Sequence, residues 1–375
     1  MARGTDAMMT RLALVLALSI VALAGCDAGD DSDAGVRVDA GARRDAGGES
    51  DAGASGDDAG ARDAGASDAG AAEVEVFVAA GWGGRRIASC DLGRTWIADQ
   101  QLAPQSDDDW HQPFTPKSLA FGDGHFVFLT GWGANSVARV SADGVTWEDH
   151  MMSTTYGAVG YADGRFVLVG NRNIAGSVDA ASWMVLDSEP ASTYDRAAGA
   201  FDGIWAAGAD GAVETRIGSG DWEALGSCAG TRHGSIGLRG GFAAGGGVLV
   251  SVGDDGDVCA RDIGTGADLG AGAIGEGVSG PPVYYDGAFH VASGSRIHTS
   301  SDGLTWTSED VPSGMSIDLI AGAASGTEVG LSRDGGRFYY RDAGGAWTAG
   351  TGPSGNGLLY VAEGRVSPSA SCPAL

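Results

Sequence analysis

The chain is short of basic residues, and most of it has no helical pattern. Of its 375 residues, 23 are Lys or Arg and 49 are Asp or Glu, which gives a formal net charge of −26. Nucleic acids and anionic lipid headgroups attract basic surfaces, so we expect this acidic chain to bind neither. After residue 73 the apolar residues do not recur at helical spacing, which excludes a helical bundle.

Long apolar runs are also missing. The most apolar stretch, Leu12–Ala24, follows Arg3 and Arg11 and is too short to span a bilayer as a helix. A basic start and a short apolar core are typical of a secretory signal peptide. Leu23–Cys26 resembles the bacterial lipobox, after which the signal is removed and the Cys is lipidated. We therefore predict a lipoprotein signal peptide over residues 1–25 and a lipid on Cys26.

The next segment, residues 26–72, lacks the apolar side chains needed for a core. It consists almost entirely of Asp, Ala, Gly, Ser and Arg, with Asp-Ala-Gly recurring along it, and has a net charge of −8. Such a composition predicts a disordered tether, which would span roughly 40 Å as a flexible chain. The remainder, residues 73–375, has a net charge of −19 and is the predicted folded domain.

Cysteines are few, with four besides Cys26. An even number in an exported protein suggests disulfides, although free buried thiols are the alternative. Three pairings are open. We favour Cys228 with Cys259, which lie about one repeat apart, and Cys90 with Cys372, which would join the last segment to the first blade.

The folded segment is rich in one repeated string that ends in Trp. The string reads Ser89–Trp96 and returns, one residue shorter, as Ser141–Trp147 and Ser300–Trp306. With degenerate copies included, the steps from Trp to Trp are 36 to 51 residues, apart from one of 84. That long step leaves room for a copy near Arg261–Gly270. A period of about 40 residues is typical of a four-stranded propeller blade, so seven copies predict seven blades.

Apolar stretches joined by Asp-Gly lie between the strings. Two examples are Leu119–Leu129 and Val159–Val169, and each predicts a β-hairpin. The unit that begins at Val74 lacks a first strand, and Gly357–Gly364 has the pattern of one without a partner. We therefore predict an all-β, seven-bladed β-propeller of four-stranded blades, closed by a C-terminal strand that joins the N-terminal blade.

The string at Ser89–Trp96 resembles, letter for letter, the Asp-box of the bacterial neuraminidase repeats, S-x-D-x-G-x-T-W. The resemblance implies a sialidase-like β-propeller, with each box at the hairpin between the third and fourth strands. It assigns a structural role to Ser89, Asp91, Gly93, Trp96, Ser141, Asp143, Gly144, Trp147, Ser300, Asp302, Gly303 and Trp306. Asp can accept turn N–H groups, Gly can take a positive φ, and Trp can cover the hairpin. The box therefore leaves function open.

The catalytic pattern of sialidases is not found. These enzymes share an arginine triad, a Tyr-Glu pair and an Arg-Ile-Pro string, whereas Arg86-Ile87-Ala88 lacks the Pro and runs directly into the first box. The histidines show no ligand spacing, so we predict no catalytic residue, metal or cofactor. Because two convergent carboxylates would suffice for glycoside hydrolysis, a diverged glycan hydrolase of sialidase-like fold is the alternative.

Two Gly-Trp-Gly strings occupy equivalent positions between second and third strands of adjacent blades. Aromatic faces beside amide groups suit sugars and peptides. The candidate ligand-binding residues in this sector are Trp82, Trp110, Trp132, Asn135, Asn171 and Arg172. Packing between blades is the alternative role for the two strings.

Together these features predict a monomeric cell-envelope lipoprotein whose non-catalytic propeller serves as a binding or assembly module for a glycan or a protein. The lipid on Cys26 would hold it on the periplasmic or outer face of a bacterial membrane, or at the cell surface. A third hypothesis is that the propeller is a purely structural spacer, because no feature of the sequence identifies a ligand.

Overall fold

The computed structural model describes residues 73–104, 114–131, 136–162, 164–170, 173–187, 196–200, 203–207, 212–217, 222–227 and 240–373. From residue 187 to residue 227 only the backbone is described. The predicted signal peptide, Cys26 and the tether lie outside these ranges, so those assignments stay predictions. Within the described residues, no helix is long and apolar enough to cross a membrane.

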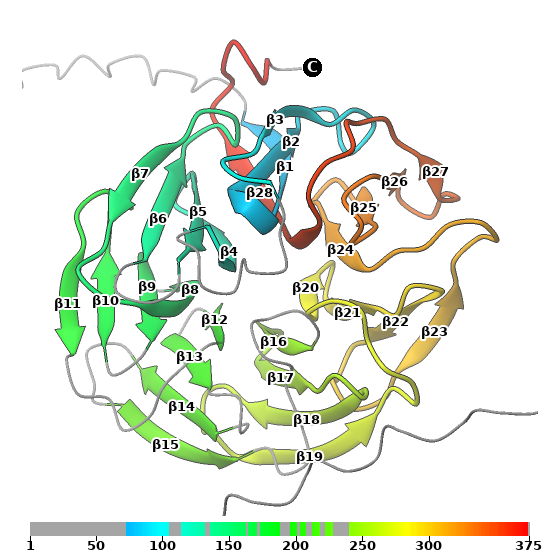
Figure 1. The fold of residues 1–375 in the computed structure, drawn as a ribbon. Helices are drawn as coiled ribbons and strands as arrows, with labels where there is room; N and C mark the ends of the chain where they lie inside the picture. Colours follow the sequence, from blue (N-terminus) through cyan, green and yellow to red (C-terminus); the bar gives the residue numbers. More distant parts are fainter. Residues whose placement is uncertain are drawn as a thin grey trace, which may run out of the picture. The chain divides into compact units, whose positions relative to one another are not determined.

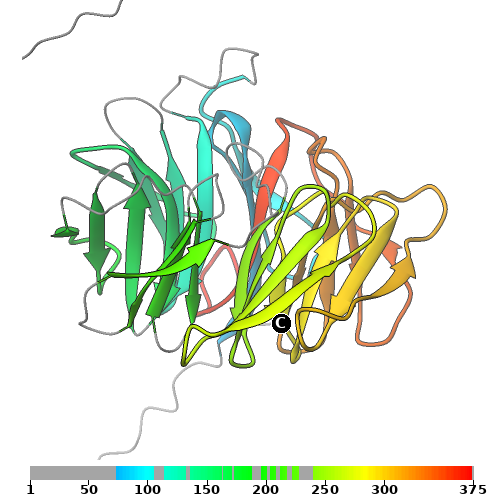
Figure 2. The same ribbon diagram turned by 90° about the horizontal axis from the view of Figure 1, so that it is seen from below.

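The described strands pair into seven four-stranded antiparallel sheets. In Figure 1 these sheets stand around a common centre, each with one strand innermost and one at the periphery. The expected all-β propeller of four-stranded blades is thus confirmed. Six of the sheets have described side chains, and the sheet β12–β15 is described through its backbone alone. Figure 2 shows the strands of the blades from the side.

Each blade has one strand of each of four kinds, in order from the centre outward. The innermost strands are β28 (Leu358–Val366), β4 (Pro116–Gly122), β8 (Tyr156–Ala162), β12 (Arg196–Ala200), β16 (Gly241–Gly245), β20 (Val283–Tyr285) and β24 (Leu319–Gly322). The second strands are β1 (Val74–Gly81), β5 (His125–Thr130), β9 (Arg165–Gly170), β13 (Gly203–Ala207), β17 (Val248–Val252), β21 (Ala288–Ala292) and β25 (Glu328–Leu331).

The third and fourth strands form the outer half of each blade. The third strands are β2 (Arg85–Ser89), β6 (Val137–Ser141), β10 (Ile174–Ser177), β14 (Ala212–Ile217), β18 (Asp257–Asp262), β22 (Arg296–Ser300) and β26 (Phe338–Arg341). The fourth strands are β3 (Ile97–Gln100), β7 (Glu148–Met151), β11 (Met184–Asp187), β15 (Trp222–Ser227), β19 (Asp268–Ala273), β23 (Thr307–Asp310) and β27 (Thr348–Ala349). A short 3-10 helix, η1 (Trp82–Gly84), connects β1 to β2.

The ring closes where the two ends of the folded segment meet. β28 pairs antiparallel with β1, from Val74 opposite Val366 to Ala80 opposite Tyr360. The innermost strands contact one another in a closed series, and β24 and β4 both contact β28. The prediction that the C-terminal strand completes the N-terminal blade is confirmed. Closure pairs the edge of β1 that would otherwise be free.

One predicted disulfide reinforces this closure. Cys90, just after β2, is bonded to Cys372, which is buried after β28, and the two are 282 residues apart in the sequence. This confirms the favoured pairing of these two cysteines. Cys259 on β18 is buried and also disulfide-bonded. Its predicted partner, Cys228, lies outside the described residues, so that pairing stays a prediction.

The core lies between neighbouring blades. On β5, Phe126 packs in one cluster with Val76 and Val78 of β1, whereas Leu129 packs in another with Leu168 of β9. Successive side chains of a strand point to opposite faces, and both faces of a blade are covered by its neighbours. This explains why most residues of the second strands are apolar on both faces, without a strict polar and apolar alternation.

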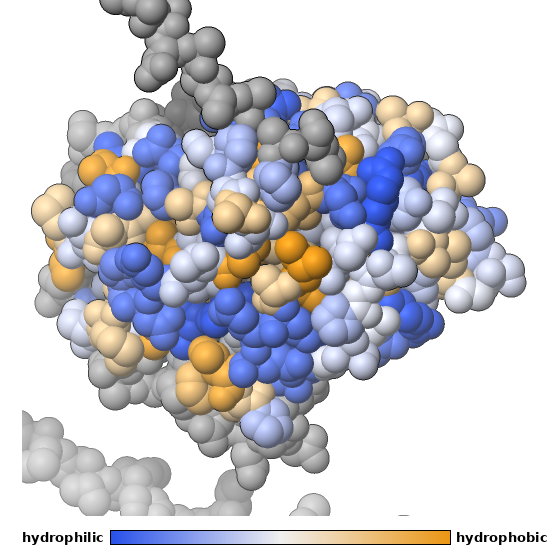
Figure 3. Space-filling model, turned by 90° about the horizontal axis from the view of Figure 1, so that it is seen from above, coloured by the Kyte–Doolittle hydropathy of each residue, from blue (hydrophilic) through white to orange (hydrophobic). Residues whose placement is uncertain are grey.

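The surface contrasts with this interior. In Figure 3, hydrophilic residues cover much of the visible face, and smaller groups of hydrophobic residues lie between them.

Candidate functional site in the central channel

The repeated strings lie in the turns between third and fourth strands. In the turn from β6 to β7, Oδ1 of Asp143 accepts hydrogen bonds from the backbone N–H groups of Val145 and Thr146 at 2.8 and 2.7 Å. The N–H of Gly144 donates to Oγ of Ser141 at 2.8 Å, and the φ of Gly144 is 75°. The carboxylate and the hydroxyl thus satisfy backbone donors that the tight turn leaves unpaired.

The turn from β22 to β23 repeats this arrangement. Asp302 accepts from the N–H groups of Leu304 and Thr305 at 2.8 and 2.7 Å, and Gly303 donates to Ser300 at 2.8 Å. These backbone donors lower the pKa of Asp302 to about 2. Nε1 of Trp306 donates to the carbonyl of Gly303 at 3.2 Å and folds the indole over the hairpin.

The glycine of each string packs against a valine of the preceding blade. A Cβ at Gly144 would overlap Val78 of β1, and one at Gly303 would overlap Val250 of β17. Gly93 has the same relationship to Val329 of β25. Glycine is required here both for its positive φ and for the close approach, so these turns join neighbouring blades.

Two further places in the chain bear on the repeat. The turn between β18 and β19 falls within Arg261–Gly270, where the spacing predicted a copy without Trp. There Asp262 accepts hydrogen bonds from the N–H and the hydroxyl of Thr265 at 2.8 and 2.7 Å.

In the first string, Trp96 is buried and stacks on Phe338, with ring centroids 5.3 Å apart.

The predicted aromatic sector is only partly described. Trp82 begins η1 and is buried, and its backbone N–H donates to the carbonyl of Gly357 at 2.9 Å. Its indole therefore does not present an exposed face to a ligand. The other candidates in that sector lie outside the described residues, so their role stays a prediction: Trp110, Trp132, Asn135, Asn171 and Arg172.

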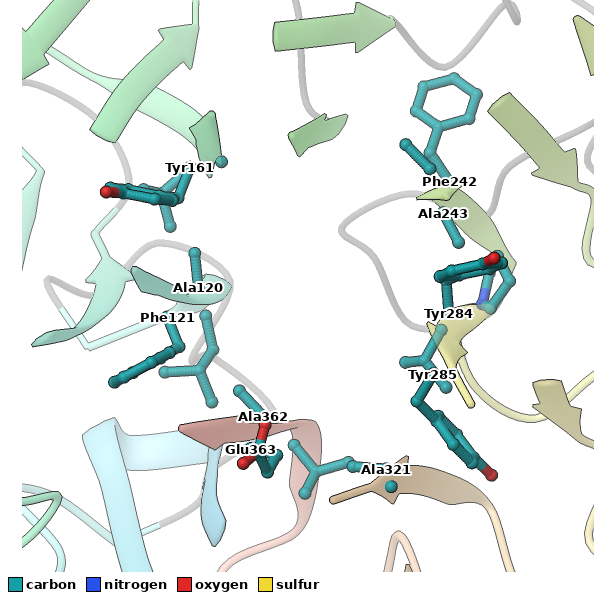
Figure 4. Close-up of a pocket in the computed structure, with 18 residues that line it drawn as sticks. Ala120, Phe121, Tyr161, Phe242, Ala243, Tyr284, Tyr285, Ala321, Ala362 and Glu363 are labelled. Atoms are coloured by element: carbon teal, nitrogen blue, oxygen red, sulfur yellow. The ribbon is translucent and has the colours of Figure 1, made fainter. Parts of the chain in front are cut away.

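The structure instead has a cavity at the centre of the propeller. Its volume is about 330 Å³, and the lining residues whose side chains the structure describes lie on or beside β4, β8, β16, β20, β24 and β28 (Figure 4). Small and aliphatic residues form most of the wall. The other lining side chains are Phe121, Tyr161, Phe242, Tyr284, Tyr285 and Glu363. A concave pocket of this size is the usual form of a ligand site, and here polar atoms contribute more of the lining surface than apolar atoms do.

Four of these aromatic rings lie against a glycine of a neighbouring innermost strand. A Cβ at any of the four glycines would overlap ring atoms, so only glycine leaves room for the ring. The pairs, ring first, are Phe121 with Gly364, Tyr161 with Gly122, Tyr284 with Gly245, and Tyr285 with Gly322.

Three of the rings also pack on a Phe of their own blade. The centroid distances are 4.7 Å for Phe121 and Phe126, 4.8 Å for Tyr161 and Phe166, and 4.9 Å for Tyr284 and Phe289. In each pair the Phe follows five positions after the channel residue, across the hairpin turn. This spacing is a signal in the sequence that could have identified the channel wall.

Among the described lining residues, Glu363 is the one with a carboxyl group. Its Oε1 is buried and has no hydrogen-bond partner. Burial, and then the carboxylate of Glu75, raise the pKa of Glu363 to about 7, while Arg365 acts in the opposite direction. The channel wall therefore holds an acid that is close to half ionised at neutral pH, and Figure 4 shows it beside Ala362 at the edge of the cavity.

Tyr285 points its hydroxyl away from the cavity in Figure 4, into a buried polar network. The hydroxyl donates to Oε1 of Glu328 at 2.6 Å, and Arg341 binds both Glu328 and Glu309. The Tyr285 ring stacks on His290 at 3.8 Å. Burial raises the pKa of Tyr285 and lowers that of His290, so both groups are neutral at neutral pH. The network joins two blades and does not open its polar atoms to the channel.

Within the described ranges, no three His, Cys, Asp or Glu side chains are grouped to hold a metal ion. In the part of the wall that the structure describes, the cavity thus offers aliphatic and aromatic side chains, exposed polar atoms and one carboxyl group.

Comparison with known proteins extends only to the fold. No family model matches the chain, and no curated protein matches its sequence. Similar solved structures include YCF48 bound to D1 peptide, which is 15% identical and aligns over 62% of this chain and 81% of that chain, with a TM-score of 0.47. Virginiamycin B lyase from Staphylococcus aureus is 12% identical over 64% and 84% of the two chains, with a TM-score of 0.49. The WD40 β-propeller domain of Doa1 is 13% identical over 74% and 88%, with a TM-score of 0.46.

Proposed function

We propose that this protein is a cell-envelope lipoprotein whose propeller is a non-catalytic binding module, and that its central channel receives part of an envelope protein. The observation that carries the proposal is the cavity of about 330 Å³ among the innermost strands. Its wall combines aromatic rings and small aliphatic side chains with one carboxyl group. Such a surface would contact the apolar side chains of a protein segment, while the polar atoms exposed beside them would form hydrogen bonds with its backbone.

The backbone adds recognition groups to this wall. Each innermost strand is the edge strand of its sheet, paired on one side only. The strand lies innermost in its blade, so its unpaired edge is at the centre of the ring (Figure 1). Free strand edges are hydrogen-bonding sites for another chain. A segment that entered the channel would therefore find apolar contacts and backbone partners together.

The sequence before the propeller supports the location of the module. The Leu23–Cys26 string favours a lipid anchor, and the acidic, core-free residues 26–72 would hold the propeller away from the membrane to which Cys26 is attached. Binding at the end of such a tether suits an assembly role on the periplasmic or outer face.

The test is to fill the channel without altering the outer surface. Ala244 is a half-buried lining residue of β16, so Ala244→Trp would occupy the cavity. Ala346→Trp places the same side chain on an exposed loop and is the matched control. Full-length wild type and both variants would be immobilised and screened against separated envelope proteins and a glycan array.

We expect the wild type and Ala346→Trp to retain the same protein partner and Ala244→Trp to lose it, with all three melting at similar temperatures. Retention of the partner by a folded Ala244→Trp variant would rule out the channel as the site. Binding to glycans alone, or turnover of a glycan, would overturn the protein-binding assignment.

A further inference from the structure

Glu363 occupies a place in the channel where a charged side chain is costly. It lies in β28 opposite Phe77 of β1, and among the described lining residues it is the only one with a carboxyl group. Its neighbours in the wall include Val361, Ala362 and Ala321. An ionised carboxylate in such surroundings is unfavourable unless a cation or hydrogen-bond donors accompany it.

The charged groups around Glu363 do not supply a direct partner. Glu75 of β1 is held by the N–H of Ser325 at 3.0 Å and by Arg365 at 3.4 Å, so the nearest cation is already shared with another carboxylate. Oε1 of Glu363 accepts no hydrogen bond. Arg365 favours the ionised form of Glu363, but burial and Glu75 outweigh it.

The other strands beside β28 do not change this balance. β24 (Leu319–Gly322) has no ionisable residue. On β4, the carbonyl of Lys117 accepts a hydrogen bond from the hydroxyl of Tyr360. Tyr360 comes three residues before Glu363 on β28, so Lys117 lies beside that position and not opposite Glu363. The carboxyl group thus faces the cavity with an acceptor atom that no described group uses.

We infer that the channel takes a basic side chain, Lys or Arg, of the protein partner, with Glu363 as its counter-ion. This deepens the proposed function and rests on it. The aliphatic stem of such a side chain would lie along the Ala, Val and Phe wall while its charged end reached the carboxylate. The aromatic rings of the wall are attractive to cations as well, and the net charge of −19 on residues 73–375 would draw a basic partner toward the propeller.

Proton linkage gives this inference a specific signature. A cation binds to ionised Glu363, so below its pKa of about 7 binding must first displace the proton. The affinity is then highest above pH 7 and falls by up to about tenfold for each pH unit below the pKa. At pH 7 binding releases a fraction of a proton to the buffer.

Calorimetry on the full-length protein with single amino-acid probes tests the inference. The probes are the N-acetyl, N-methylamide derivatives of lysine and arginine, with the norleucine derivative as the uncharged match and glucosamine as an amino sugar. We expect a basic probe to bind at least about tenfold more tightly than norleucine at pH 8, a difference of about 1.4 kcal/mol. Proton release should appear as a dependence of the heat on the buffer.

Two variants make the result specific. Glu363→Gln should bind lysine and norleucine within about threefold and lose the pH dependence, while melting no lower than the wild type. Glu75→Gln keeps Glu363 but removes a like charge, so it should retain the preference and move the pH profile to lower pH.

Equal binding of the lysine, arginine and norleucine probes by the wild type would overturn the inference, as would an unchanged preference in Glu363→Gln. If glucosamine bound more tightly than the lysine and arginine probes, the ligand of the channel would be an amino sugar and not a protein side chain. If these probes fail while Ala244→Trp still abolishes partner binding, the inference is wrong and the proposed function stands.

Discussion

The ring of Phe121 on β4 lies against the backbone of Gly364 on β28, so that the closing strand contacts the next blade through an aromatic side chain. The contact is possible because Gly364 has no Cβ. Phe121 also packs on Phe126 of its own blade at 4.7 Å, which fixes the ring in place. The channel wall is therefore held by contacts between blades, and its shape depends on these glycines.

We predict that Gly364→Ala destabilises the propeller by about 1–3 kcal/mol, because the new methyl group would overlap the Phe121 ring and force it to shift. Chemical denaturation followed by tryptophan fluorescence measures this. Gly264→Ala is the control, since a Cβ there meets only a side-chain oxygen of Asp262 at 3.6 Å. Similar stabilities for the two variants would show that the ring contact does not constrain the closing strand.

Much of the fold follows from spacing in the sequence, because spacing reports strand and turn lengths. The repeat period predicted four-stranded blades, and the unpartnered C-terminal strand predicted closure through β1. The pairing of Cys90 with Cys372 followed from where the two ends had to meet. These features depend on the order of elements along the chain and not on the direction of any side chain.

The channel wall was not predicted, because its described residues come from many blades and only the closed ring defines the directions of their side chains. Tyr161 and Phe121 looked like ordinary strand residues, although each lies five positions before a Phe. Glu363 looked like the polar end of a closing strand. Trp82 was predicted as a ligand contact because Gly-Trp-Gly lies between a second and a third strand beside amide groups, and in the structure its side chain is buried in η1.

The turn carboxylates should make stability depend on pH in the acid range. The pKa of Asp302 is about 2 in the fold and near 3.9 in an unfolded chain. A lowered pKa contributes stability that is present above about pH 4 and is lost as the pH falls through about 2. Because Asp302 is exposed, we expect the contribution to be below about 1 kcal/mol.

Asp302→Asn should therefore be less stable than the wild type at pH 6, and the difference should shrink near pH 2.5. Urea denaturation at both pH values measures it. Asp257→Asn is the control for the loss of one surface charge, because Asp257 is exposed at the start of β18. A difference that stays constant between the two pH values would mean that the charge of Asp302 is not what stabilises the turn.

The disulfide between Cys90 and Cys372 should contribute about 2–5 kcal/mol, since it restricts an unfolded chain over 282 residues. The Cys90→Ser, Cys372→Ser double variant should melt at a lower temperature than the wild type. The two should become similar once both proteins are fully reduced, since reduction also breaks the disulfide of Cys259. A wild type whose melting does not respond to reductant, with the bond verified by mass spectrometry, would show that strand pairing alone maintains closure.

Arg85 links the first blade to the loop before the closing strand. Its side chain is fully buried, and it donates to Asp99 at 2.8 Å and to the carbonyls of Pro353 and Asn356 at 2.8 and 2.7 Å. It also donates to the carbonyl of Gly335 at 2.6 Å. Removing this guanidinium would leave buried acceptors, one of them charged, without donors.

We expect Arg85→Met to cost about 3–5 kcal/mol and to speed hydrogen exchange in residues 353–358, because that loop loses its anchor. The loss of stability in Arg85→Lys should be smaller than in Arg85→Met but still measurable, because a single ammonium group cannot make all the hydrogen bonds of the guanidinium. Arg94→Met is the matched control: its ion pair with Asp342 is exposed, so its loss should cost less than about 1 kcal/mol. If exchange in the loop were the same in Arg85→Met and Arg94→Met, the closing strand would be held by its pairing with β1 and not by the buried arginine.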